Sequence, residues 1–104
     1  MKMAMIHNFA VIKIGEIDWN EIEISVHDRF IFPNLEKFLK VDTFWGGFDK
    51  NSSKGLDWCG YTYIPPISID AFFEAIKDIE GLEELRDLCL IAKRENAWIE
   101  HKGL

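Results

Sequence analysis

Seven consecutive residues, Glu21 to His27, alternate strictly between polar and apolar side chains. Successive side chains of a β-strand point to opposite faces, so this pattern predicts a strand with one buried face and one outer face. The outer set is Glu21, Glu23, Ser25 and His27. The fold must therefore include a sheet, and a hydrophobic core must cover the three apolar residues between them.

The rest of the sequence predicts the partners of that strand. Apolar and β-branched runs predict strands over 9–14 and 97–101, and the aromatic stretch before a polar run predicts a long hairpin with its loop over 49–55 and its return arm over 56–64. Asn34 is expected to cap a helix through Lys40, with Phe32 held out of it because proline follows. Ser68 is expected to cap a helix over 69–79.

Helical periodicity indicates which residues of the last two helices face the core. The helix over 69–79 has an apolar stripe of Ile69, Phe72, Phe73 and Ile76, and a helix over 82–95 has Leu82, Leu85, Leu88, Cys89 and Ala92. Trp58 and Trp98 are expected in the same core. Strands and helices come in separate groups, which predicts an α+β fold: one domain over 1–104, with a mainly antiparallel sheet packed by two or three helices.

Composition limits the classes of partner and compartment. The 104 residues suffice for one core, and the net charge of -6 repels nucleic acid and favours a basic partner. The first apolar run is too short for a signal peptide or a membrane span, so we expect a cytoplasmic protein with no membrane partner. Cys59 and Cys89 are expected to stay reduced, as small buried packing residues.

No motif in the sequence predicts a catalytic, metal or cofactor site. The three histidines are far apart along the chain, and glycine-rich phosphate-binding patterns do not occur. We therefore expect no enzyme activity, no metal and no cofactor. One alternative is a small ligand-binding protein or hydrolase that uses His27 or His101 with nearby carboxylates. Another is a structural subunit that forms a homodimer through the aromatic loop.

Acidic residues are the most informative pattern in the chain. Five acids lie between Glu16 and Asp28 with no lysine or arginine among them, and such a segment suits a cationic partner, although solubility alone is an alternative explanation. The acids of the helices, from Asp70 to Asp87, are a weaker candidate because solvated helix faces are often acidic. The favoured partner-binding residues are Asp18, Trp19, Glu21, Glu23 and Asp28, and the second choice is Trp45, Asp49 and Asp57 beside the aromatic loop.

The second half of the chain resembles a known family. It contains Trp-Cys-Gly-Tyr-Thr-Tyr-Ile-Pro-Pro over 58–66, then Ser68 and a Phe72-Phe73 helix, and it ends in Ile-Glu-His-Lys-Gly-Leu over 99–104. This pattern is similar to that of small bacterial immunity proteins of polymorphic toxin and contact-dependent growth inhibition systems. Lys102 stands where the family more often has an aromatic residue.

The resemblance implies a stoichiometric inhibitor that binds a cognate toxin domain and blocks its active site. Many such toxins are nucleases, which are basic, and an acidic inhibitor complements them. The motif residues Gly60, Thr62, Pro65, Pro66 and Ser68 are then expected to build the fold, with the interface elsewhere. The resemblance does not extend to the first half of the chain, so no interface residue is transferred from the family.

Overall fold

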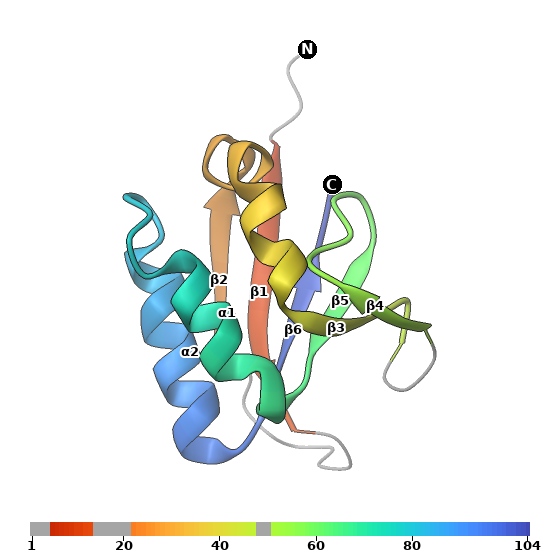
Figure 1. Ribbon diagram of the computed structural model, residues 1–104. Coiled ribbons are helices and arrows are strands. Elements are labelled where there is room, and N and C mark those ends of the chain that lie inside the picture. Colours follow the sequence, from red (N-terminus) through yellow and green to blue (C-terminus); the bar gives the residue numbers. More distant parts are fainter. Residues whose placement is uncertain (1–4, 14–21, 48–50) are drawn as a thin grey trace.

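The computed structural model describes residues 5–13, 22–47 and 51–104, and the strands within them form one antiparallel sheet. The sheet has the order β2-β1-β6-β5-β3-β4 (Figure 1). Its strands are β1 (Ile6–Ile12), β2 (Ile22–His27), β3 (Asp42–Trp45), β4 (Asn51–Lys54), β5 (Tyr61–Ile64) and β6 (Trp98–Lys102). The first and last strands in sequence are thus neighbours near the middle of the sheet.

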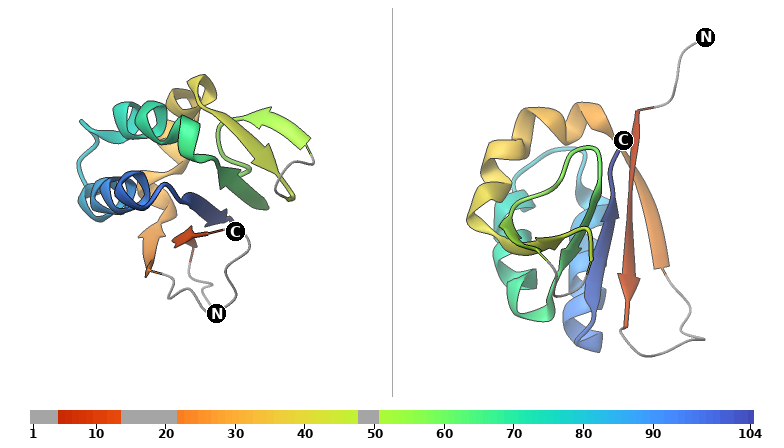
Figure 2. Two further views of the ribbon diagram at one scale, coloured as in Figure 1. Left: turned by 90° about the horizontal axis from the view of Figure 1, so that it is seen from below. Right: turned by 90° about the vertical axis from the view of Figure 1, so that its right-hand side faces the viewer.

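The helices all lie on one face of this sheet, as both views in Figure 2 show. Two are α-helices, α1 (Ile69–Ile76) and α2 (Glu83–Glu95), and three are 3₁₀ helices, η1 (Asp28–Phe30), η2 (Phe32–Lys40) and η3 (Pro66–Ser68). This arrangement confirms the α+β prediction. No helix in the described ranges has both the length and the apolar character needed to cross a bilayer.

The core fills the space between the helices and the sheet, and the predicted helical stripes face it. All five residues of the α2 stripe are buried, as are Ile69, Phe72 and Ile76 of α1, while Phe73 is half-buried against the core. Phe72 contacts Phe9 of β1 and Phe38 of η2, with ring centroids 6.3 and 5.7 Å apart. One aromatic side chain of α1 therefore joins the sheet to η2.

The alternation of β2 is confirmed in direction, but its inner face is only partly covered. Val26 is buried and Ile24 half-buried, whereas Ile22 is 43% exposed. β2 lies at the edge of the sheet, so it has a neighbouring strand on one side alone among the described residues. Glu23, Ser25 and His27 are exposed as predicted.

Several predictions of local structure are wrong, and one is the Ser68 cap, because the Ser68 side chain makes no hydrogen bond to the start of α1. The polar run predicted as a hairpin loop includes strand β4, which pairs with β3 from Asp42 opposite Lys54 to Trp45 opposite Asn51. An edge strand needs no apolar face, so periodicity does not reveal it. Phe32 belongs to η2, because Pro33 lies in the first turn of the helix, where a backbone N–H has no intrahelical partner. Asn34 does not cap the helix, since its side-chain amide donates to the Phe30 carbonyl.

Three predictions of burial are also wrong. Trp58 and Trp98 are half-buried, and Cys59 is exposed. Trp58 and Cys59 lie in the turn that precedes β5, not inside a strand, so their side chains reach the surface. Cys89 is buried in the α2 stripe as predicted, and burial raises the pKa of its thiol to about 12. Both cysteines are free thiols.

Candidate functional site

A chain of buried polar side chains crosses the end of the sheet where β1 begins and β6 ends. His7 Nε2 lies 2.7 Å from Asp28 Oδ1, and His7 Nδ1 lies 2.8 Å from His101 Nε2. His101 Nδ1 is 3.4 Å from the Thr62 hydroxyl, and the Trp58 indole N–H donates to Asp28 Oδ1 over 2.7 Å. This hydrogen-bonded series of side chains joins β1, η1, β5, β6 and the turn before β5.

The hydrogen bonds assign the protons of this chain when they are followed from the carboxylate. An ionised Asp28 only accepts, so His7 Nε2 donates to it. With one proton on each imidazole, His7 Nδ1 accepts from His101 Nε2. His101 Nδ1 accepts from the Thr62 hydroxyl, whose oxygen in turn accepts from the Asp57 backbone N–H.

Burial supports a neutral His101. The imidazoles of His7 and His101 are wholly buried and stacked, with centroids 5.1 Å apart. Burial, and secondarily the neighbouring His7, lowers the pKa of His101 to about 3. Because these buried side chains bond to one another, they hold together the strands and turns from which they come. Within the described ranges, no group of three or more His, Cys, Asp or Glu side chains is arranged to hold a metal ion.

The face of the sheet turned away from the helices carries a second group of polar and aromatic side chains. His7, Phe9 and Val11 of β1 point to the core, so the residues between them point to the opposite face. The strand register aligns Ser25, Asn8, Lys102 and Tyr61 in one row and places Glu23 and Glu100 in the next. We call these six residues the open face.

The open face combines exposed and fixed side chains. Tyr61 is 50% exposed and Glu23 is exposed, while Ser25 donates a hydrogen bond of 2.7 Å to the Asn8 side-chain oxygen. The Tyr63 hydroxyl donates a hydrogen bond to Glu100, and burial together with this carboxylate raises the pKa of Tyr63 to about 12. Side chains on a sheet are held by a rigid scaffold, which suits recognition of another folded surface.

The favoured partner-binding residues have different fates. Glu23 lies on the open face as predicted. Asp28 is only 7% exposed, and its Oδ1 is bonded to His7 and Trp58, so little of its carboxylate is accessible to a partner. The sequence does not predict this bond, because no local pattern around Asp28 indicates a buried histidine on another strand. Asp18, Trp19 and Glu21 lie outside the described residues.

The second-choice residues are not presented as a group. Trp45 is half-buried, and its indole N–H donates to the Gly55 carbonyl over 2.9 Å. Asp57 is half-buried beside the turn before β5, where the Cys59 thiol lies 3.9 Å from its Oδ1. Asp49 lies outside the described residues.

The two histidines considered as alternatives for a hydrolase or ligand site lie in different surroundings. His27 is exposed on the outer side of β2, where its Nδ1 accepts from the Arg29 backbone N–H and caps η1. His101 is buried on the helix side of β6. The two imidazoles thus lie on opposite faces of the sheet, and His101 has His7 as its partner.

The motif residues of the resemblance lie where they organise the fold. Thr62 and His101 belong to the buried chain, and Gly103 donates its N–H to the Gly60 carbonyl over 2.8 Å. A Cβ atom at Gly103 would meet the Trp58 carbonyl oxygen at 2.3 Å, so this position requires glycine.

Comparisons with protein-family models, with curated protein sequences and with solved structures give no match to this chain. The fold and the placement of the side chains therefore carry the functional argument, together with the sequence resemblance.

Proposed function

We propose that this chain is an immunity protein that binds a basic toxin domain, of nuclease type, and blocks its active site through the open face. The observation that carries the proposal is the one-sided packing of the sheet, which leaves Tyr61 and Glu23 accessible on a rigid surface. Tyrosine is enriched among the residues that dominate protein interfaces, because its ring buries a large area with few rotatable bonds.

The net charge of this protein indicates that the proposed partner is basic. The whole chain carries -6, and this field attracts a basic domain from a distance and raises the association rate. On the open face itself, Glu23 and Glu100 are acidic and Lys102 is basic, so short-range recognition there depends on paired positions as well as on net charge. A catalytic surface rich in lysine and arginine, as a nuclease needs for phosphates, supplies such cationic groups.

The direct test is neutralisation. The C-terminal domain of the effector encoded immediately upstream is produced in cells with and without this chain, and cell survival and co-purification are measured. The proposal predicts survival, a one-to-one complex, and no protection against an unrelated nuclease domain. An upstream gene of metabolic type, or death of cells that contain the intact chain, contradicts it.

A further inference from the structure

A pocket of about 460 Å³ opens at the start of α1. Its walls come from η2, β3, β4, η3, α1 and β6. They include Phe44, Pro65, Ile67 and Trp98, with Ser68 and Lys40 among the polar members. The rings of Phe44 and Trp98 are 5.9 Å apart and tilted. The volume and the aromatic lining are those of small-molecule sites.

Two features here are unusual for a folded chain. Ile67 is 90% exposed, although apolar surface in water is unfavourable. Ser68 is only 6% exposed, yet its hydroxyl makes no capping hydrogen bond to α1 and has no partner in the described part of the chain. Ser68 lines the pocket, and no side-chain oxygen of the described residues is both fully buried and unbonded.

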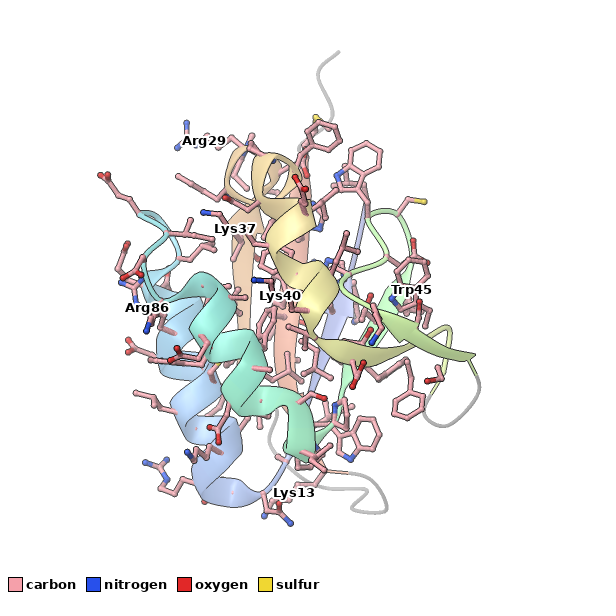
Figure 3. The ribbon with its side chains drawn as sticks, viewed as in Figure 1. Lys13, Arg29, Lys37, Lys40, Trp45 and Arg86 are labelled. Carbon is pink, nitrogen blue, oxygen red and sulfur yellow. The ribbon has the colours of Figure 1, made fainter. Side chains whose placement is uncertain are left out.

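Lys40 supplies the charge. It lines this pocket and also an adjacent one between η2 and α1, and Figure 3 shows it on η2 next to α1. Asp42, the acid that lines the pocket, is paired with Lys54. A hydroxyl donor and an ammonium group beside aromatic walls match a carboxylate on a flat apolar body.

We propose that this pocket binds a small aromatic monocarboxylate, with the carboxylate held by Ser68 and Lys40 and the ring placed among Phe44, Ile67 and Trp98. Such a ligand covers the exposed Ile67 and satisfies the Ser68 hydroxyl at once. Binding at this site does not depend on the proposed toxin.

The test is a titration of the ¹⁵N-labelled protein with phenylacetate, and with phenethylamine as a cation of similar shape. Saturable shifts confined to the amides of 67–71 and the Trp98 indole support the site. Ser68→Ala and Lys40→Gln should each weaken binding by about tenfold or more, as expected for the loss of one hydrogen bond to a charged group. Lys37→Gln is the matched control, because Lys37 lies on the same helix but does not line this pocket.

Three results overturn the proposal: no saturable shift with phenylacetate, equal binding of phenethylamine, or equal weakening by Lys37→Gln and Lys40→Gln. The amide spectra of the variants report whether each one is folded, so a loss of binding is separated from a loss of structure.

Discussion

Acidification should destabilise this protein in a pH range set by one buried histidine. His101 has a folded-state pKa of about 3, well below the value of 6.5 for a free imidazole. The groups that face it are His7, Thr62 and the ring of Phe9, and beyond His7 lies Asp28. Between pH 6.5 and pH 3, His101 is protonated in the unfolded protein and neutral in the folded protein. The stabilisation is therefore complete above pH 6.5 and is lost as the pH falls from there toward 3.

The size of the effect follows from linkage. Well below pH 6.5 the free energy of unfolding should fall by about 1.4 kcal/mol per pH unit from this group alone. Between pH 7 and pH 5 the expected loss is about 2 kcal/mol, a large share of the roughly 5–15 kcal/mol that stabilises a domain. Most carboxylates remain ionised in that range, so histidine dominates the change.

The assay is urea unfolding followed by tryptophan fluorescence at a series of pH values from 7 to 5. His101→Gln should flatten the dependence, while His27→Asn, a change at an exposed capping histidine, should leave it as in the parent. NMR of the imidazole nitrogens reports the same proton directly and needs no variant. A stability that stays constant over this range, or a His101 imidazole that is charged in the folded protein at pH 5, would refute the reasoning.

Two further predictions concern the core. Phe72→Ala should lower the free energy of unfolding by about 3–5 kcal/mol, because a wholly buried ring leaves a cavity, whereas Leu90→Ala at an exposed position should change it by less than about 0.5 kcal/mol; equal effects in urea unfolding would remove Phe72 from the core. A thiol reagent should modify Cys59 alone in the native protein and both cysteines in urea, since Cys89 is buried with a pKa of about 12; rapid native labelling of Cys89 would contradict its placement.

The parts of the fold that were predictable have strong local periodicity. Alternation located β2, and the three- and four-residue spacing of apolar side chains located α1 and α2 with their buried faces. Strand β4 was missed because an uncovered edge strand with the sequence Asn-Ser-Ser-Lys has no apolar pattern. Trp58 was misplaced because a large aromatic residue in a turn has the same composition signal as one in a strand.

The candidate site was harder to predict because it depends on which strands are neighbours. Alternation in 97–101 correctly separated His101 from Trp98 and Glu100, but it gave no indication that β6 pairs with β1. That pairing brings His7 to His101 and aligns Glu100 with Glu23 across Ala10. Sequence separations as large as the 94 positions between the two histidines leave no local signal.

The affinity of the complex with the upstream toxin domain, measured for one charge reversal on each face, tests the central claim most directly. Glu23→Lys changes the open face, and Asp87→Lys makes the same change at an exposed position of α2 on the opposite side. Both variants should melt like the parent. The account predicts that Glu23→Lys weakens binding tenfold or more, which is about 1.4 kcal/mol, while Asp87→Lys binds as the parent does. Parental affinity and salt dependence for Glu23→Lys, or a greater loss for Asp87→Lys, would contradict binding through the open face.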